Sequence, residues 1–571
     1  MRQHPRTSAL TTLAFAALMP CAAIPVVVCP VLAANITIVN ADGAGEGFND
    51  PTAAVPVGGN AGATVGAQRL IVFQTAANYW GTLLPSAVTI RVNARFDPLT
   101  CTPTGAVLGS AGPLGVFRDF GGAEFAGHWY HSALANKLAG FDLDGGDDIQ
   151  AQFNSNLNGS PGCLGGAGWY LGLDGVEGIN VDLLPVVMHE LGHGLGFSTT
   201  TNGTTGNYLS GFPALWDHFL LDRVTSLHWD QMSAGQRAAS AISNYQLSWD
   251  GDAATFESRF ELDPRPENVV TAPAGIAGTY LSGKSLFGAA LTTGGVTAQV
   301  VQALDGSGST TDACEAITNG AALSGKIAFV DRGTCPFTQK ALNVQAAGAV
   351  GIIIANNVNT GAFEMLATNG SVTIPVTNVD QIGGNLIRPQ LAGGVTATMR
   401  IHPTARAGTD DLNRPLLYTP NPFQGGSSVS HFEVLSYPNA LMEPAINLDL
   451  APGDVDLTRF LFEDIGWLPR TTGVSTPAAS RAASVVGAPN PFQSSAVLRF
   501  ELSRPGLVDL SVFDTQGRLV RRITNAWMPA GPHGFEWNGL DDAGREVGAG
   551  VFLSRLRTGD GDSYGRLVRV N

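Results

Sequence analysis

His189-Glu190-Leu191-Gly192-His193 is the segment from which the architecture of this chain can be inferred. On a helix, histidines four residues apart lie on the same face, so both imidazoles can bind one ion. Glu190 would project beside that ion and accept a proton from a water, whose pKa zinc lowers to about 7. The apolar residues before the motif, Val181 to Met188, predict a buried helix, and Gly196 allows a sharp turn after it. The segment therefore predicts a catalytic zinc helix.

A catalytic zinc site needs three protein ligands and keeps a fourth position for water. In the compact form of this motif the third ligand lies three residues after the glycine, and here that position is Thr199, a poor zinc ligand. The best candidate for a third ligand in its place is His431, in Ser430-His431-Phe432-Glu433. Ala440-Leu441-Met442-Glu443-Pro444 follows shortly afterwards. This order of motifs resembles the leishmanolysin-like metzincins, in which a long insertion precedes the third histidine and a methionine turn. The resemblance implies that His431 is the third ligand and that Met442 lies beneath the metal as an apolar floor.

Several other polar residues are weaker candidates for metal binding. Asp217 could replace Thr199 as a ligand, but a helix residue with an ordinary hydrogen-bonding partner is the favoured interpretation. His218 and His228 are expected to be structural, as isolated histidines usually are. A glycine-containing loop carries four acidic residues whose oxygens would suit Ca²⁺, although a solvated turn is favoured because the loop lacks a full EF-hand pattern. These four are Asp142, Asp144, Asp147 and Asp148.

The composition is that of a globular, turn-rich protein of several domains. Hydrophobic residues make up 44% of the 571 residues and charged residues 14%, with 71 Gly and 33 Pro. The formal net charge is −15, and no basic stripe is visible, so nucleic acid is not expected as a partner.

The first 34 residues are typical of a secretory signal. Arg2 and Arg6 precede an apolar stretch that ends in the small-residue cleavage pattern Val31-Leu32-Ala33-Ala34. Three prolines interrupt that stretch, and no second apolar span follows, so removal is favoured over a membrane anchor. Four cysteines remain, an even number that suggests disulfides in an exported protein. Three connectivities are open for Cys101, Cys163, Cys314 and Cys335, and nearness in sequence favours Cys101–Cys163 and Cys314–Cys335.

Two further parts of the chain resemble known modules. Residues 325–337, Gly-Lys-Ile-Ala-Phe-Val-Asp-Arg-Gly-Thr-Cys-Pro-Phe, closely resemble the core of the protease-associated (PA) domain, and the pattern predicts strand, loop, helix and buried strand. The insertion of this module between two zinc ligands implies a covering or recognition role. Pro489-Asn490-Pro491-Phe492 and the short strands after it resemble FlgD-like and secretion-sorting β-sandwich domains. A purely structural Ig-like module is the alternative.

The expected fold class is α+β multidomain: a metzincin-type zinc metalloprotease domain split by a β/α PA domain, followed by an all-β Ig-like sandwich. In the first part we expect helices at 67–84, 212–221 and 233–242, and strands at 88–96 and 149–153. The resemblance to metzincins implies an edge strand there that aligns an extended peptide. The expected divisions are a signal peptide at 1–34, metalloprotease at 35–263, inserted PA domain at 264–406, metalloprotease at 407–469, linker at 470–487 and Ig-like domain at 488–571.

These patterns predict a secreted zinc metalloendopeptidase. His189, His193 and His431 would hold one Zn²⁺, with Glu190 as the general base acting on protein or peptide substrates. The predicted location is extracellular or at the cell surface after bacterial export, with no stable membrane span. Contact with secretion machinery or the cell surface would occur through the C-terminal domain. Two alternatives are a catalytically idle surface binding or adhesion protein, and a zinc hydrolase of non-peptide amides.

Overall fold

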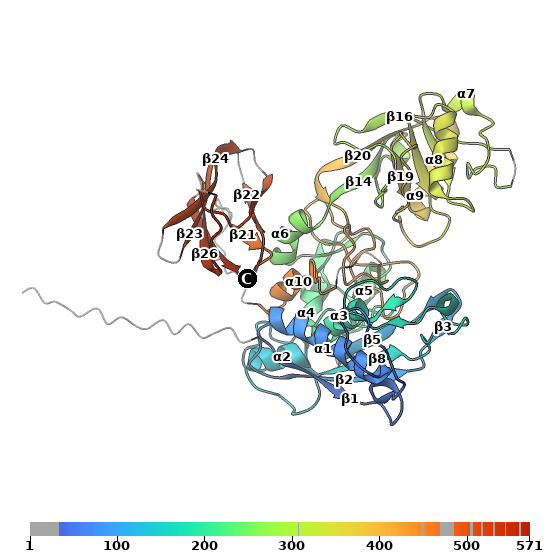
Figure 1. Ribbon diagram of the computed structural model, residues 1–571. Helices are drawn as coiled ribbons and strands as arrows, with labels where there is room; N and C mark the ends of the chain where they lie inside the picture. The colour runs from blue at the N-terminus through green and yellow to red at the C-terminus, as the bar shows by residue number, and fades with distance from the viewer. Residues whose placement is uncertain are drawn as a thin grey trace, which may run out of the picture.

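The computed structural model describes residues 33–306, 308–447, 450, 452–468, 485–502, 506–514, 518–528, 531–542, 544–558 and 561–570. Nearly all of the expected signal segment (1–34) and of the expected linker (470–487) lies outside these residues. Figure 1 shows three parts: a body formed by the segments before and after an insertion, the insertion itself, and a C-terminal β-rich part. Within the described residues, no helix is both long and apolar enough to cross a membrane.

The first part is built on a four-stranded sheet covered by two helices. The strand order is β1 (Ile36–Asn40), β2 (Ile90–Asp97), β8 (Ile149–Asn154) and β5 (Gly109–Pro113). The first three strands are parallel, and β5 runs antiparallel to β8 at the edge. Helices α1 (Val65–Leu83) and α3 (Leu183–Leu195) pack against each other and against this sheet. The helix expected at 67–84 and the strands expected at 88–96 and 149–153 are confirmed, within two residues at each end.

One hydrophobic core joins the segments on either side of the insertion. Phe432, Met442 and Trp467 belong to the same buried cluster as residues of α1, α3 and β8. The Trp467 indole N–H donates to the carbonyl of Leu195, the last residue of α3, at 2.7 Å. The described residues of 407–447 and 452–468 therefore complete the body begun by residues 33–263.

The helix expected at 212–221 is much shorter than the sequence suggests. Helix α4 covers only Leu215–Phe219, and the chain then enters strand β11 (Leu220–Asp222). Leu220 and Leu221 pair with β13 (Leu247–Trp249), so strand pairing takes over where an apolar run would have continued a helix. The helix expected at 233–242 is α5, Ala234–Ser240.

Close packing of α3 on the sheet makes Gly194 sensitive to substitution. A Cβ at Gly194 would overlap the side chain of Ile149, which is fully buried and branched at Cβ. We expect Gly194→Ala to lower the free energy of unfolding by about 1–3 kcal/mol. The matched control is Gly235→Ala on the exposed face of α5, where a Cβ would meet no atom within 4 Å. That change should raise stability by about 0.5–1 kcal/mol, and chemical denaturation measures both. Equal effects of the two substitutions would contradict the packing.

The insertion has a seven-stranded sheet of its own. The strand order is β15 (Gly278–Leu281), β14 (Pro264–Ala272), β20 (Val395–Arg406), β16 (Val296–Gln302), β17 (Ile327–Asp331), β18 (Gly351–Ala355) and β19 (Val376–Val379). Helices α8 (Phe337–Ala346) and α9 (Gln381–Ile387) accompany the parallel strands, and two buried clusters belong to this part alone. The order β17, α8, β18 confirms the expected strand, loop, helix and buried strand.

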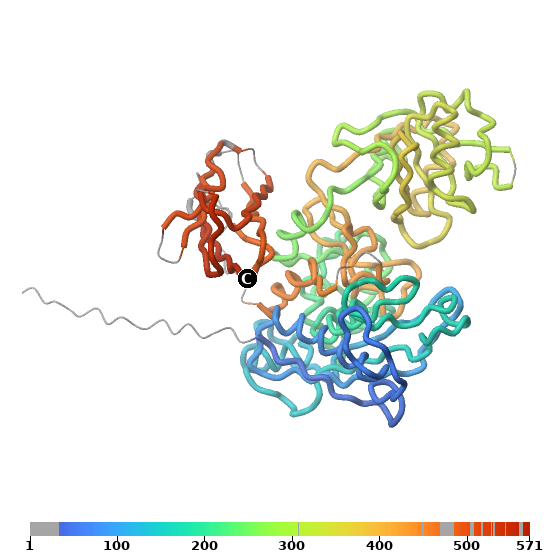
Figure 2. The backbone as a smooth tube through the Cα atoms, in the orientation of Figure 1, coloured from blue at the N-terminus to red at the C-terminus, as the bar shows by residue number. Residues whose placement is uncertain are grey.

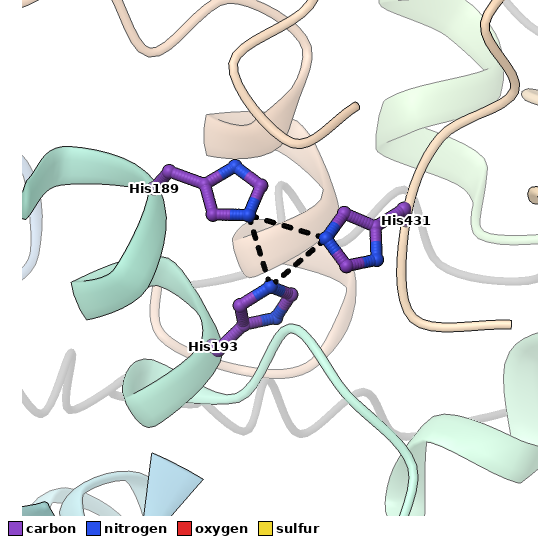
Figure 3. A group of neighbouring side chains, drawn as sticks. All are labelled: His189, His193 and His431. Carbon is purple, nitrogen blue, oxygen red and sulfur yellow. Dashed lines mark hydrogen bonds between the residues drawn. The ribbon is translucent and has the colours of Figure 1, made fainter. Parts of the chain in front are cut away.

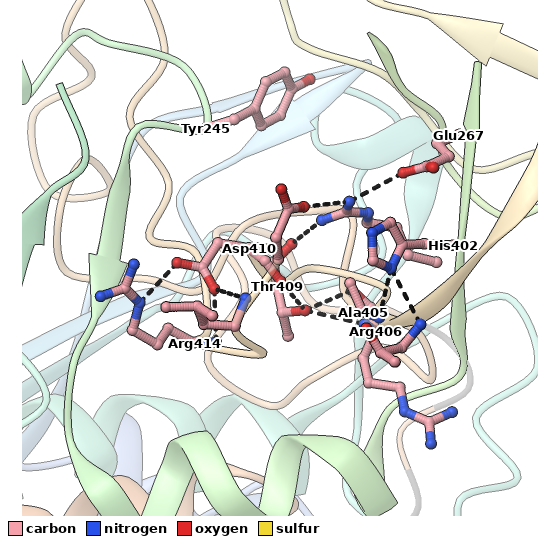
Figure 4. A network of polar contacts seen from close by, with 12 residues as sticks. Tyr245, Glu267, His402, Ala405, Arg406, Thr409, Asp410 and Arg414 are labelled. Carbon is pink, nitrogen blue, oxygen red and sulfur yellow. Dashed lines mark hydrogen bonds and ion pairs between the residues drawn. The ribbon is translucent and has the colours of Figure 1, made fainter. Parts of the chain in front are cut away.

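Two antiparallel strands, β14 and β20, carry the chain into and out of the insertion side by side (Figure 2). A network of ion pairs, centred on the buried Arg265 and Glu267, crosses their base (Figure 4). The Arg265 guanidinium donates to Glu267 at 3.0 Å, to Asp411 at 2.6 Å and to the Thr409 carbonyl at 2.9 Å. Arg400 donates to the other oxygen of Glu267 at 2.8 Å. Glu267, which is fully buried, thus links the two strands through Arg265 and Arg400. The bonds from Arg265 to residues 409 and 411 fix the strands to the segment that leads back towards His431.

The C-terminal part is a sandwich of two antiparallel sheets. One sheet has the order β21 (Val486–Ala488), β22 (Ala496–Leu502) and β25 (Gly531–Trp537). The other has the order β24 (Leu519–Met528), β23 (Gly506–Asp514), β26 (Gly550–Thr558) and β27 (Gly561–Arg569). Their inner faces share one buried cluster. Arg499 of β22 pairs with Glu261, the last residue of helix α6 (Asp252–Glu261), at 2.6 Å.

Both favoured disulfides are present. Cys101 bonds Cys163 in the first part, and Cys314 bonds Cys335 in the insertion. Each bond lies within one part of the structure, as nearness in sequence predicts.

Candidate metal centre

Three histidines from two distant segments meet at one point (Figure 3). His189 and His193 lie one turn apart on α3, and His431 comes from the loop after β20. The Nε2 atom of His189 is 3.1 Å from those of His193 and His431, and the latter two are 3.2 Å apart. All three residues are buried.

Local structure accounts for the position of each ring. The Asp182 side chain caps the start of α3 by accepting a hydrogen bond from the Leu184 N–H at 3.0 Å. Gly196, with φ of 131°, caps the helix after Leu195, three residues beyond the second histidine. The backbone of His431 is tied to the neighbouring segment, because its carbonyl accepts a hydrogen bond from the Tyr418 N–H at 2.9 Å.

Each imidazole uses its other nitrogen to donate to a backbone carbonyl. His189 Nδ1 lies 2.7 Å from the Leu441 oxygen, and His193 Nδ1 lies 2.8 Å from the Phe197 oxygen. His431 Nδ1 lies 2.8 Å from the Ser427 oxygen. A carbonyl can only accept, so every Nδ1 carries a proton and every Nε2 of a neutral ring presents a lone pair. Three lone pairs that face one another within 3.2 Å are mutually repulsive unless a cation lies among them.

The electrostatics keep these rings in the form that binds metals. Burial lowers the pKa of His189 to about 4 and that of His193 to about 3, where the proximity of His189 adds to the shift. Burial also lowers the pKa of His431 well below its ordinary value. Neutral imidazoles are zinc ligands, and Zn–N bonds of about 2.0–2.1 Å in a tetrahedral site hold nitrogens about 3.3 Å apart. The spacing, the tautomers and the charge of the three rings therefore fit zinc.

Glu190 lies between α3 and the edge strand β5. It is buried, and its carboxylate accepts a hydrogen bond from the Ala111 N–H of β5. Burial raises the pKa of Glu190 to about 8, whereas that hydrogen bond lowers it. A Cβ on Gly109 would come within 3.2 Å of Glu190 Cγ, so the strand approaches the glutamate closely. β5 ends the strand order of its sheet, and its outer edge pairs with no other strand in the described part of the chain.

Met442 packs directly under the ligand helix. Its sulfur would be 2.7 Å from a Cβ on Gly192, the residue just before His193, so glycine is needed there for this approach. The Met442 carbonyl accepts from the Phe432 N–H at 2.9 Å, which ties the turn at 440–443 to the residue after His431. The neighbouring Leu441 supplies the acceptor for His189. The turn thus supports two of the three histidines.

The weaker candidates have other partners. The Asp217 carboxylate accepts from the hydroxyls of Thr199 and Thr201 and from the Ala214 N–H, so it anchors the chain after α3. Among the four acidic loop residues, Asp147 pairs with Arg91 at 2.8 Å, and Asp148 accepts from the Asn136 amide at 2.7 Å. Asp142 accepts from the N–H groups of the loop itself. Protein donors, rather than a converging ligand set, thus surround these carboxylates.

Two family matches cover separate parts of the chain. The PA domain family matches residues 296–387, and the FlgD Ig-like domain family matches residues 490–560. The protein contains a PA domain and a FlgD-like Ig domain. The first match lies within the insertion and the second within the C-terminal sandwich, so the overall arrangement is α+β multidomain with a β-rich Ig-like end.

The matching relatives share only short segments with the chain. ER degradation-enhancing alpha-mannosidase-like protein 3 of Xenopus laevis is 36% identical over 138 residues, which is 22% of this chain and 15% of that protein. An aminopeptidase of Pseudomonas aeruginosa is 47% identical over 70 residues, 12% of this chain and 13% of its own length. Because their names describe different activities, these short matches alone fix no activity. The structure of BSAP, a zinc aminopeptidase from Bacillus subtilis, is 23% identical and covers 26% of this chain and 36% of its own, with a TM-score of 0.19. An overlap of this size establishes no common overall fold.

Proposed function

We propose that the chain is a zinc-dependent metalloendopeptidase of the leishmanolysin-like metzincin type, with His189, His193 and His431 as the ligands of one zinc ion. The main support is the convergence of three Nε2 lone pairs while every Nδ1 donates to a carbonyl. The packing of Met442 under Gly192 and the long insertion between the second and third histidines also support it.

The residues around the ligands suit hydrolysis of an amide. A zinc ion bound there would supply Lewis acidity that polarises the scissile carbonyl and makes a water easier to deprotonate. Ionised Glu190 accepts the proton of the attacking water and passes it to the leaving amine nitrogen as the carbon–nitrogen bond breaks. Burial favours the protonated form, and the charge of a zinc ion beside the carboxylate would favour the ionised one. The Ala111 N–H holds the Glu190 carboxylate in position between these transfers.

The edge strand β5 gives a reason to favour peptides over other amides. Its outer edge offers backbone N–H and C=O groups to which an extended peptide can add as a further antiparallel strand. Since β5 also contacts Glu190 through Ala111, a peptide on that edge would pass the general base. Pairing along an edge does not require a free peptide terminus, so cleavage within a chain is proposed.

The other two modules are assigned roles around this centre. The PA domain returns the chain to the segment that carries His431, so we assign it a covering or substrate-selecting role for large proteins. We assign to the FlgD-like domain a role in export and in contact with the cell surface or the secretion machinery. The rival function, a binding protein without catalysis, needs neither Glu190 nor the ordered imidazole tautomers.

Metal removal combined with two kinds of substrate tests the proposed function. The full secreted chain should cleave casein and an internally quenched peptide blocked at its N-terminus. We expect a chelator such as 1,10-phenanthroline to reduce both rates by more than about 100-fold, and added zinc to restore them. Cleavage only of peptides with a free N-terminus would make the protein an aminopeptidase. Zinc binding without hydrolysis of any peptide would favour the idle binding protein.

A further inference from the structure

A second group of potential ligands lies outside the proposed catalytic centre. His128, His218 and Asp230 bring one ligand atom each within 4.8 Å of one another. They come from three segments: the loop before strand β7 (Tyr130–His131), helix α4, and the short helix η3 (Trp229–Gln231). His218 is therefore not isolated, since it contacts Asp230, 12 residues later in the chain, and its ring lies beside that of His128, which comes from a distant segment. The expectation that His218 has a structural role stays a prediction.

The tautomer of His128 leaves a lone pair aimed at a carboxylate. Its Nδ1 lies 3.0 Å from the Ala126 carbonyl and must donate to it. Its Nε2 faces Asp230 Oδ2 at 3.4 Å. Two acceptors face each other there unless a proton or a cation lies between them. A hydrogen bond from a protonated imidazole to a carboxylate would be about 2.7–2.9 Å long, whereas two ligands of one zinc ion lie about 3.3 Å apart.

His218 and Asp230 complete the group, which offers an ion two imidazole nitrogens and one carboxylate oxygen. His218 Nδ1 lies 2.8 Å from the same Asp230 oxygen, which is the length of a hydrogen bond, so an ion bound there would replace the proton that the imidazole donates. Asp230 Oδ1 is buried and has no hydrogen-bond partner in the described part of the protein. The His218 side chain is 34% exposed, while those of His128 and Asp230 are 14% and 12% exposed. Solvent can thus reach one side of the group, where water could complete the coordination.

We propose that His128, His218 and Asp230 bind a second divalent transition-metal ion, of which zinc is the matching class, with a structural role. Two imidazoles and a carboxylate suit zinc or cobalt better than Ca²⁺, which prefers oxygen alone. The ion joins the loop that ends at His128 to α4 and η3. The backbone of the adjacent Trp129 already joins this loop to the start of α4. Its N–H donates to the Pro213 carbonyl at 2.8 Å, and its carbonyl accepts from the Leu215 N–H at 2.8 Å. The ion reinforces that junction and takes no part in hydrolysis.

Zinc stoichiometry tests this site separately from the catalytic one. After dialysis of the full chain against zinc-buffered solution at about pH 8, where protons compete only weakly for the ligands, we expect about two equivalents per chain by mass spectrometry of the metal. Asp230→Asn and His218→Gln should each bind about one equivalent and keep casein hydrolysis within about twofold of the parent. His218 is the most exposed member, so His218→Gln tests the site if Asp230→Asn folds poorly. His228→Gln is the matched control, because His228 pairs with Asp250 at 3.0 Å and should leave two equivalents.

The outcomes separate the two metal proposals. His431→Ala should also remove one equivalent, and the combined His431→Ala and Asp230→Asn protein should bind none. One equivalent in the parent that His431→Ala abolishes and Asp230→Asn leaves intact would overturn the second site alone. Loss of an equivalent in Asp230→Asn but none in His431→Ala would instead overturn the catalytic assignment.

Discussion

Replacing Glu190 with glutamine should abolish peptide hydrolysis while zinc stays bound. The amide has nearly the same shape and keeps an oxygen that can accept from the Ala111 N–H, so the contact with β5 is preserved. It cannot take the proton of the attacking water, and loss of a general base typically costs about 10²–10⁴-fold in rate. The measurement is the turnover of a blocked peptide by Glu190→Gln, together with zinc content by metal analysis.

The control for this substitution removes a carboxylate elsewhere. Glu536 lies on an exposed position of β25 in the C-terminal sandwich, so Glu536→Gln should leave both turnover and zinc content unchanged. Hydrolysis by Glu190→Gln at a rate near that of the parent would exclude Glu190 as the general base. Loss of zinc from Glu190→Gln would mean that the carboxylate supports the metal centre rather than proton transfer.

Replacing His431 with alanine should remove the catalytic zinc and the activity together. The substitution deletes one of three converging Nε2 atoms and leaves the hydrogen bonds of His189 and His193 to their carbonyls intact. Loss of an outer partner of a ligand already costs about 10–100-fold in metal affinity, so loss of a ligand should cost more than about 100-fold. Zinc affinity by competition with a chelating dye, and turnover of casein, measure the two effects.

Two further variants show whether the effect belongs to this histidine. His533→Ala changes a histidine of the C-terminal sandwich and should bind as much zinc as the parent. Asp217→Asn keeps a side-chain oxygen for Thr199 and Thr201 and should also retain zinc. If zinc were lost from Asp217→Asn and kept by His431→Ala, the third ligand would lie next to α3 rather than beyond the insertion.

The ligand helix could be predicted because its information is local. A helical spacing of four residues, an apolar lead and Gly196 fix both the face and the end of α3 without any tertiary contact. His431 is different, since 238 residues separate it from His193 and no periodicity connects them. Its assignment came from a resemblance between motifs, and the structure adds the shared core and the hydrogen bond from His189 to Leu441 that bring the two segments together.

Other features of the site depend on contacts that residue types do not encode. Strand β5 has the sequence Gly-Ser-Ala-Gly-Pro. Glycine and proline are generally depleted in strands, so this strand forms through pairing with β8 rather than through residue propensity. The acceptors of the three imidazoles are backbone carbonyls, which every residue possesses. The approach of His128 to His218 and Asp230 is similarly invisible in the sequence, because 102 residues separate His128 from Asp230.

A diffraction experiment on zinc-loaded crystals, with data on both sides of the zinc absorption edge, tests the central claim most directly. We predict an anomalous peak about 2.0–2.2 Å from the Nε2 atoms of His189, His193 and His431, with Glu190 beside it and not coordinated. A catalytic zinc held by α3 without His431, or no peak among the three rings, would contradict the account.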